Sequence, residues 1–333
     1  MLLSILEAFD DAWATTLPYA RIREELPADR FVRVDGQLVH VEQAGRGEPV
    51  VLLHGFGCSS YSWRHVLPVL ARDFRVVAPD LNGFGYTERP RGVQPYTVQG
   101  QARLVLRLLD ALGLRRVHVV GHSYGGAVAS WLAARHRQRL RSLTLVDPAL
   151  PDYDVWVRRR FARYRSLGSL LLRSVVLSRR AVERSLRAAF FDPSLVTPDL
   201  VAAYRDRLRV EGCDEAYRGL CAPIPERPAT VDFRRLRVPT LVVWERDDRW
   251  LSLPVAARQA LEIPGAERAE LEHCGHAPME ERPAELLAAV LPFLRRHSPL
   301  ALRQRLAALL RAAARPAPLA VPVPAPVRVR VLP

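Results

Sequence analysis

Short, mostly apolar runs alternate with longer amphipathic stretches through much of the chain. We expect buried strands at 50–53, 75–78, 117–120, 142–146 and 240–244. Helical spacing of apolar residues is found between these runs, at about 62–71, 97–112, 124–136 and 253–262. Strands that are apolar on both faces and joined by helices indicate a parallel sheet that is covered on both sides. The predicted fold class is therefore α/β, with a doubly wound, mostly parallel sheet.

Two further patterns extend this sheet at its ends. Apolar runs at 31–34 and 38–42 lie around Asp35-Gly36, a dipeptide suited to a tight turn, so we expect a hairpin there. A short strand pattern at 268–271 precedes a last helix at about 284–296.

The alternation stops between Asp147 and Val238, where helical patterns occur at 156–172, 178–190 and 198–210 without a convincing strand. The strand pattern then resumes, which predicts an all-helical lid inserted after one strand of the sheet. Such a lid covers the carboxyl edge of the sheet, where ligands bind in open α/β folds. We divide the chain into an N-terminal amphipathic extension, an α/β core, a helical cap and a basic helix with a Pro/Val-rich tail, at 1–30, 31–150 with 236–297, 151–235 and 298–333.

The two extensions have patterns of their own. Apolar positions in the first 27 residues follow near-helical spacing, interrupted by Pro18 and Pro27, and we expect a helix packed on the main domain. The C-terminal extension reads as a solvated Arg/Leu/Ala helix followed by an extended tail. The alternative is a weak contact with a membrane surface through either extension.

Composition limits the class of protein. The chain has 333 residues, 49% of them hydrophobic, which is enough for a sizeable core. No apolar run approaches the roughly 18 residues that span a bilayer, and we expect no signal peptide. The four cysteines show no CxxC or metal-binding spacing, so we expect free thiols in the cytoplasm.

The net charge of +14 comes entirely from arginine, because the chain has no lysine. Residues 152–235 hold 17 Arg against 11 acidic residues, and residues 298–333 hold six Arg and no acid. No aromatic–basic stripe and no nucleic-acid motif accompanies this charge. We therefore expect a small-molecule substrate and no nucleic-acid partner.

The strongest chemical signal is the string Gly121-His122-Ser123-Tyr124-Gly125-Gly126, which directly follows an expected strand and precedes an expected helix. A serine in such a sharp turn presents its hydroxyl off the sheet edge, and small neighbours give the backbone room. A serine hydroxyl needs a base, and the base needs an orienting acid. Strand-end loops downstream supply both, in the order Ser, Asp, His.

Five motifs in this order resemble the α/β-hydrolase fold family with a helical cap, over about residues 31–297. They are His54-Gly55, the loop 80–85, the serine turn 121–126, the acidic loop 245–249 and Gly275-His276. The resemblance implies that Ser123 is the nucleophile, that His276 is the general base and that Asp248 orients it.

Two alternatives to Asp248 stay open. The family usually has Gly where this chain has Glu245, so Asp247 is a second candidate for the acid. Asp147 is a third, because some relatives place the acid at that strand end. We prefer a loop-fixing role for Asp147.

An oxyanion hole needs two backbone N–H donors. Tyr124, the residue after the nucleophile, supplies one of them, and Phe56 is expected to supply the other, with Gly57 as the alternative. No HExxH and no His/Asp cluster at ligand spacing occurs, so we expect no metal and no cofactor. Five aromatic residues are candidates for an apolar pocket wall: Tyr61, Trp63, Phe84, Tyr153 and Trp156.

Serine at the nucleophile position selects acyl transfer. Relatives that open epoxides or displace halide carry Asp there, which argues against both reactions. We expect a carboxylic ester hydrolase for apolar acyl groups, acting through an acyl-enzyme. The alternatives are a carbon–carbon bond hydrolase of diketone acids, an acyltransferase or perhydrolase, and a non-catalytic ligand-binding relative. For a diketone acid, three arginines of the predicted cap are candidates to attract the carboxylate: Arg158, Arg159 and Arg160.

Overall fold

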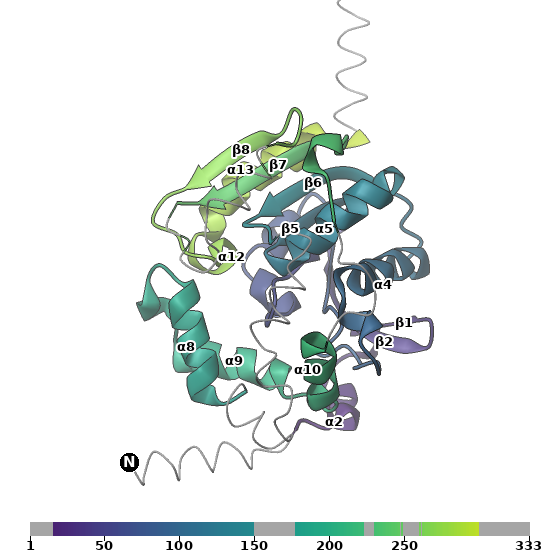
Figure 1. Ribbon diagram of the computed structural model, residues 1–333, viewed down its shortest axis with the longest axis vertical. Helices are drawn as coiled ribbons and strands as arrows, with labels where there is room; N and C mark the ends of the chain where they lie inside the picture. The colour runs from purple at the N-terminus through teal and green to yellow at the C-terminus, as the bar shows by residue number, and fades with distance from the viewer. Residues whose placement is uncertain are drawn as a thin grey trace, which may run out of the picture.

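The computed structural model describes residues 16–149, 177–222, 230–246, 248, 260 and 262–299. Its centre is an eight-stranded sheet with the order β1-β2-β4-β3-β5-β6-β7-β8 (Figure 1). The strands are β1 (Phe31–Val34), β2 (Gln37–Ala44), β3 (Pro49–Leu53), β4 (Arg75–Pro79), β5 (Val117–His122), β6 (Leu140–Val146), β7 (Thr240–Glu245) and β8 (Glu267–Leu271).

Pairing in the sheet changes from antiparallel to parallel along its width. β1 pairs with β2, and β2 with β4, in antiparallel fashion, whereas β4, β3, β5, β6, β7 and β8 form parallel pairs. The hairpin between β1 and β2 turns at Asp35 and Gly36, which both have positive φ. All parallel strands thus end at the same edge, and residues that follow β3, β5, β6 and β7 gather there.

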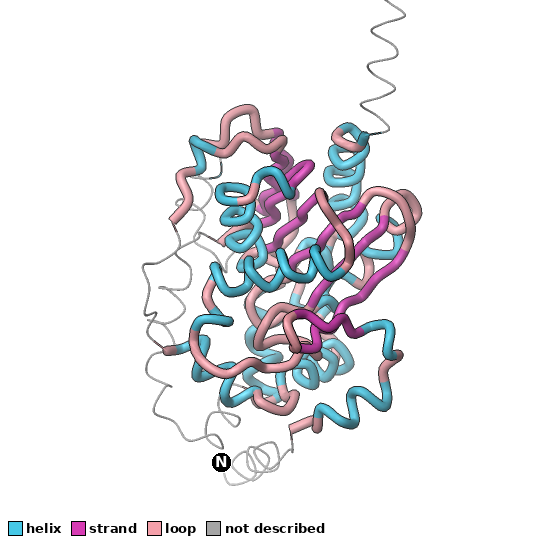
Figure 2. The backbone as a smooth tube through the Cα atoms, turned by 90° about the vertical axis from the view of Figure 1, so that its right-hand side faces the viewer, coloured by secondary structure: helices cyan, strands magenta, loops and turns pink. Residues whose placement is uncertain are grey.

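Alternate residues of each buried strand face opposite layers of core. Val51 and Leu53 pack into one core and Val50 and Leu52 into the other, as the two-residue period of a strand requires. The first core lies under α4 (Val98–Ala111) and α5 (Tyr124–Arg135). The second lies under α3 (Leu67–Leu70), α12 (Pro278–Glu281) and α13 (Pro283–Arg296). Figure 2 shows helices flanking the strands.

Between β6 and β7 the regular elements among the described residues are helices, with no named strand. These are α8 (Arg179–Ala189), α9 (Pro198–Leu208) and α10 (Cys213–Cys221), and Figure 1 shows them as a group apart from the sheet. Ser178 and Thr197 cap α8 and α9 by accepting hydrogen bonds from backbone N–H groups in the first turn. Apolar faces of α8 and α9 pack together in a third buried cluster. An N-terminal helix, α2 (Tyr19–Glu25), begins after Pro18, and Leu17 forms a β-bridge with Val210.

The fold class predicted from the sequence is confirmed, and the expected strands and the hairpin are found within a few residues of their predicted bounds. The prediction of a helix at 62–71 was wrong for a continuous helix. The structure has a 3₁₀ turn at Ser60–Trp63 and then α3, because Pro68 has no N–H to donate within a longer helix. The helix α10 was not expected.

Several predictions lie outside the described residues: the helices at 156–172 and 253–262, apart from residues 260 and 262, and most of both extensions. The proposed domain boundaries stay a prediction. In the part of the chain that the structure describes, no helix is long and apolar enough to cross a membrane.

Candidate active site

Ser123 lies in the turn between β5 and α5, at the edge where the parallel strands end. Its backbone is strained, with φ of 50° and ψ of −116°. Neighbouring backbone holds this conformation: the Ser123 N–H donates to the carbonyl of Val146, and the Ser123 carbonyl accepts from Gly126 and Ala149. The strained turn places the hydroxyl at the start of α5, where the helix dipole is positive.

The glycines on either side of Ser123 are required because other backbone passes close to them. A Cβ built on Gly125 would lie 2.2 Å from the carbonyl oxygen of Leu53. A Cβ on Gly121 would lie 2.5 Å from the carbonyl oxygen of Gly125. Gly125 therefore lets the start of α5 approach the end of β3, and Gly121 lets the end of β5 approach the first turn of α5.

Three side chains from three strand ends meet at this edge. The Ser123 hydroxyl lies 2.9 Å from Nε2 of His276, and Nδ1 of the same ring lies 2.8 Å from Oδ2 of Asp248. With His276 neutral, the hydroxyl donates to Nε2, and Nδ1–H donates to the carboxylate. All three residues are buried. This chain of hydrogen bonds can carry a proton from an attacking serine to the imidazole and hold the resulting imidazolium.

The loop that carries His276 is bonded to its neighbours on both sides. Nε2 of His122 donates to the carbonyl of His276 at 2.7 Å, and burial keeps the pKa of His122 well below its ordinary value, so this ring is neutral. The His276 N–H donates to the carbonyl of Ala189 at the end of α8, at 2.7 Å. The position of His276 is thus tied to the helices between β6 and β7.

Glu281 on α12 strengthens the same connection. One carboxylate oxygen accepts the Gly275 N–H at 2.9 Å, and the other accepts the N–H of Phe191 at 2.7 Å. Burial raises the pKa of Glu281, while these N–H donors oppose the rise. One side chain therefore joins the His276 loop to the segment after α8.

The loop after β3 is fixed by His54. Nδ1 of this ring donates to the carbonyl of Gly55, and Nε2 accepts the N–H of Leu81 at 3.0 Å. Burial lowers the pKa of His54, in keeping with a neutral ring. The loop brings Gly55 to Ser123, because a Cβ on Gly55 would lie 3.2 Å from the serine Cβ. The assignment of the Phe56 and Tyr124 N–H groups to an oxyanion hole stays a prediction.

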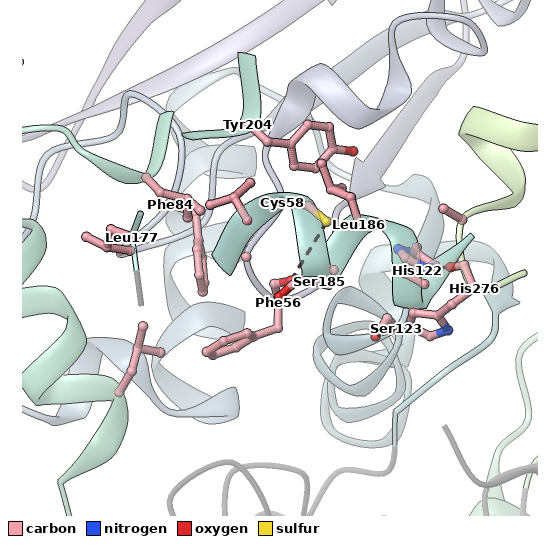
Figure 3. Close-up of a pocket in the computed structure, with 18 of the residues that line it drawn as sticks. Phe56, Cys58, Phe84, His122, Ser123, Leu177, Ser185, Leu186, Tyr204 and His276 are labelled. Atoms are coloured by element: carbon pink, nitrogen blue, oxygen red, sulfur yellow. Dashed lines mark hydrogen bonds between the residues drawn. The ribbon is translucent and has the colours of Figure 1, made fainter. Parts of the chain in front are cut away.

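A cavity of about 220 Å³ opens next to Ser123 (Figure 3). Ser123, His122 and His276 lie at one end in this view, and Leu177 lies at the other. Helix α8 supplies most of one wall, and the rest is largely aromatic or aliphatic, with no arginine among the described lining residues. Prominent members are Phe56, Phe84, Val182, Leu186, Phe190 and Tyr204. An apolar group of a substrate fits such a cavity.

The aromatic residues that the sequence predicted to line the pocket lie in different places in the structure. Phe84 lines it, whereas Trp63 is fully buried in the core under α13. Tyr61 packs between the guanidinium groups of Arg64 and Arg207 and does not line the cavity. Tyr153 and Trp156 lie outside the described residues, as do Arg158, Arg159 and Arg160.

Among the candidates for the acid, Asp248 is the hydrogen-bond partner of His276. Asp147 lies near, with its Oδ2 3.9 Å from His276 Nδ1, and Asp247 lies outside the described residues. Within the described chain, Asp147, Asp248 and His276 are also a group with metal-ligand atoms, all within 4.8 Å of one another. Since His276 already bonds Asp248 and Ser123, we interpret the group as a proton-carrying cluster.

Sequence patterns did not identify four residues of the site. Glu281, Ser185 and Ala189 contribute through the packing of α8 against the core, and Cys58 lines the cavity from the loop after β3. The apolar face of α8, at Val182 and Leu186, is the one signal in the sequence that points to a wall there.

Comparison with known proteins places this site in a family. Residues 48–283 match the alpha/beta hydrolase fold family. The chain belongs to this family.

Similar proteins include several hydrolases. The chain is 30% identical over 275 residues to 2-hydroxy-6-oxo-2,4-heptadienoate hydrolase of Pseudomonas putida, covering 80% of this chain and 95% of the relative. A meta-cleavage product hydrolase from Pseudomonas fluorescens has a similar structure, with a TM-score of 0.67, 25% identity and coverage of 80% and 97%. A thermophilic esterase from Thermogutta terrifontis follows with a TM-score of 0.64, 26% identity and coverage of 80% and 98%.

Proposed function

We propose that the protein is a serine hydrolase in which Ser123 is the nucleophile, His276 the general base and Asp248 the acid that orients it. The observation that carries the proposal is the continuous contact from Ser123 Oγ through the imidazole to Asp248, at 2.9 and 2.8 Å. The opening of the cavity beside the serine supports it, because a substrate carbonyl has space there.

We propose further that the bond cleaved is a carbon–carbon bond next to a ketone, in a diketone acid of the 2-hydroxy-6-oxo-dienoate type. Hydrolases named for such compounds, or for meta-cleavage products, are similar to this chain over about 80% of its length. This is the alternative that the sequence analysis placed behind ester hydrolysis, and the relatives favour it over the ester.

The proposed chemistry uses the same three groups in every step. His276 accepts the hydroxyl proton as Ser123 Oγ bonds to the ketone carbon. Cleavage needs the 2,6-diketo tautomer of the substrate, which forms before the attack when the 2-hydroxy proton moves to C5. The C5–C6 bond then breaks, its electron pair is delocalised into the C2 ketone, and the imidazolium of His276 protonates the leaving carbon. Water, deprotonated by His276, attacks the acyl-enzyme, releases a carboxylic acid and returns the proton to Ser123.

Ester hydrolysis is the second candidate, and the character of the cavity favours it. The described lining is largely apolar and contains no arginine to neutralise a substrate carboxylate. An uncharged ester with an apolar acyl group suits such a wall. The structural similarity to an esterase agrees with this candidate.

Turnover of three substrates decides between the two. We would measure kcat/KM for 2-hydroxy-6-oxohepta-2,4-dienoate, for its methyl ester at the acid end, and for p-nitrophenyl butyrate. Carbon–carbon hydrolysis predicts that the dienoate exceeds the butyrate by about 100-fold or more, a difference of about 2.7 kcal/mol in transition-state binding. A butyrate value that exceeds the dienoate value establishes the ester hydrolase instead.

The methyl ester shows whether the carboxylate is recognised. A strong preference for the free acid indicates a cation near the cavity, and equal values indicate an apolar end. Absence of turnover with every substrate, together with binding of the dienoate, would contradict the proposal and favour a ligand-binding relative. Turnover by Ser123→Ala equal to that of the wild type would contradict the role of the serine.

A further inference from the structure

A second carboxyl group faces the imidazole of His276. Asp147 is the first residue after β6, and its N–H donates to the carbonyl of Val243 on the neighbouring strand β7. Its φ of 39° is unusual for a residue other than glycine and turns the chain sharply at the strand end. The side chain is fully buried beside the end of β7, where Asp248 also arises.

The two oxygens of Asp147 have different surroundings. Oδ1 accepts the N–H of Glu245 at 3.3 Å, which fixes the end of β7. Oδ2 has no hydrogen-bond partner in the described part of the chain and lies 3.9 Å from Nδ1 of His276. A loop-fixing role uses Oδ1 alone, so it leaves unexplained why a second oxygen points at the imidazole.

Two carboxyl groups in this space cannot both carry a charge at low cost. The nearest oxygens of Asp147 and Asp248 and the His276 nitrogen lie within 4.8 Å of one another. Burial, and after it the charges of Asp248 and Glu281, raise the pKa of Asp147 well above its ordinary value. The charged form of Asp147 is therefore disfavoured beside Asp248, which is the hydrogen-bond partner of His276.

Few other groups near Asp147 can change this balance. Cys274, in the loop before α12, is a neutral thiol because burial raises its pKa strongly. Glu245 on β7 is buried and offers its backbone N–H. His276 is the group that becomes a cation during the proposed reaction, and an imidazolium at 3.9 Å favours ionisation of Asp147.

We propose that Asp147 is a second acid of this centre, a positioning residue that supports Nδ1 of His276 beside Asp248 and takes its place when Asp248 loses its charge. The inference rests on the proposed hydrolase function. It means that the acid of the site is shared between the ends of β6 and β7. Asp147 never contacts the substrate and acts through the imidazole alone.

Three variants test the proposal: Asp147→Asn, Asp248→Asn and the double variant. Asparagine keeps an oxygen for the Glu245 N–H, so the loop bond survives in Asp147→Asn. In a serine protease, loss of the acid lowers kcat by about 10⁴-fold. We expect Asp248→Asn to retain about 1–10% of kcat/KM, and the double variant to fall to the full loss of about 10⁴-fold.

The pH profile of activity distinguishes a role of Asp147 in supporting His276 from a purely structural role of Asp147. Activity of Asp248→Asn should require ionised Asp147, whose pKa burial still raises, so its kcat/KM should rise at higher pH than that of the wild type. The double variant should lack this rise. A structural role predicts no shift in the profile.

Two results would overturn the inference: equal activity of Asp248→Asn and the double variant, or an Asp248→Asn profile that matches the wild type. Thermal unfolding of each variant shows that it is folded, and Asp248→Ser repeats the test with a smaller side chain if the asparagine variant unfolds. If the inference about Asp147 is overturned but Ser123→Ala is inactive, the proposed function remains intact. An active Ser123→Ala removes the proposed function itself.

Discussion

Two buried Asp–His pairs in the described part of the chain share the same contact between ring and carboxylate. Nδ1 of His276 lies 2.8 Å from Oδ2 of Asp248, and Nδ1 of His40 lies 2.8 Å from Oδ2 of Asp80. Asp80 directly follows β4, and Asp248 lies shortly after β7. All four side chains are at most 7% exposed. A search for an Asp–His pair alone would not separate them.

The second nitrogen of each ring makes the difference. Nε2 of His276 meets the Ser123 hydroxyl at 2.9 Å, whereas Nε2 of His40 has no hydrogen-bond partner among the described residues and lies 3.7 Å from a carboxylate oxygen of Glu42. Asp80 is also saturated with donors, because it accepts the N–H groups of Ser60 and Tyr86. An Asp–His pair thus becomes a candidate catalytic unit only when a nucleophilic hydroxyl lies at the second ring nitrogen.

The largest expected effect is at the nucleophile. Ser123→Ala should lower kcat/KM by about 10⁴-fold or more, because it removes the hydroxyl that bonds to His276 Nε2. Steady-state kinetics with the dienoate and the butyrate measures the loss. Ser130→Ala, at a buried serine on α5, is the control and should retain its activity. Equal losses in both variants would show that the effect comes from folding.

The two histidines should respond in opposite ways. His276→Ala should abolish the base and lower kcat/KM by about 10³-fold or more. His40→Ala should keep kcat but lower the free energy of unfolding by about 2–4 kcal/mol, since the buried Asp80 loses a donor. Urea denaturation and kinetics on both variants check this. A His40 variant that is stable but inactive would contradict the distinction.

Another buried histidine, His118, sharpens the comparison, because its ring nitrogens face the hydroxyl groups of Ser142 and Ser298. Burial, and then the charge of Arg141, lower the pKa of His118 to about 3. Between the ordinary value of about 6.5 and that pKa the unfolded chain binds a proton that the folded chain does not, so stability falls as pH falls. Above pH 6.5 the ring is neutral in both states and contributes no slope.

This slope is at most about 1.4 kcal/mol per pH unit for one group. We would measure the free energy of unfolding by denaturation at several pH values from 7 to 4. It should fall less steeply with falling pH in His118→Gln than in the wild type. Identical pH dependence of the two proteins would show that His118 is not the source.

The smallest effect is expected where α8 meets the His276 loop. Glu281→Gln replaces one accepting oxygen by a donor and so disrupts a bond to Gly275 or Phe191. We expect kcat/KM to fall by about 3- to 10-fold, equivalent to about 1 kcal/mol, with KM affected as well as kcat. Glu285→Gln on the exposed face of α13 is the matched control. Unchanged kinetics of Glu281→Gln would show that the link does not position His276.

Much of the fold could be predicted because its strands are buried on both faces. The run that became β3 is apolar throughout, and the run that became β5 is apolar apart from His118 and His122; this pattern predicts a strand without knowledge of its neighbours. The helix α10 escaped prediction because it is short, and Gly212 before it offers no side-chain cap. Pro68 carries the information that a continuous helix at 62–71 is excluded.

Parts of the candidate site could likewise be predicted from the sequence, and other parts could not. The turn around Ser123 and the Gly275-His276 loop have local sequence signals, so both residues could be selected from the sequence. The convergence of Asp147 and Asp248 on one imidazole depends on β6 and β7 being neighbours, which no local pattern specifies. The wall contributed by α8 likewise depends on tertiary packing.

Covalent labelling of the nucleophile tests the central claim most directly. An organophosphate such as paraoxon should add one phosphoryl group per chain, and peptide mass spectrometry should place that group on Ser123. His276→Ala should label far more slowly, and His40→Ala at the wild-type rate. A label on another residue, or dienoate and ester turnover that continues with Ser123 unmodified and the reagent in excess, would contradict the account.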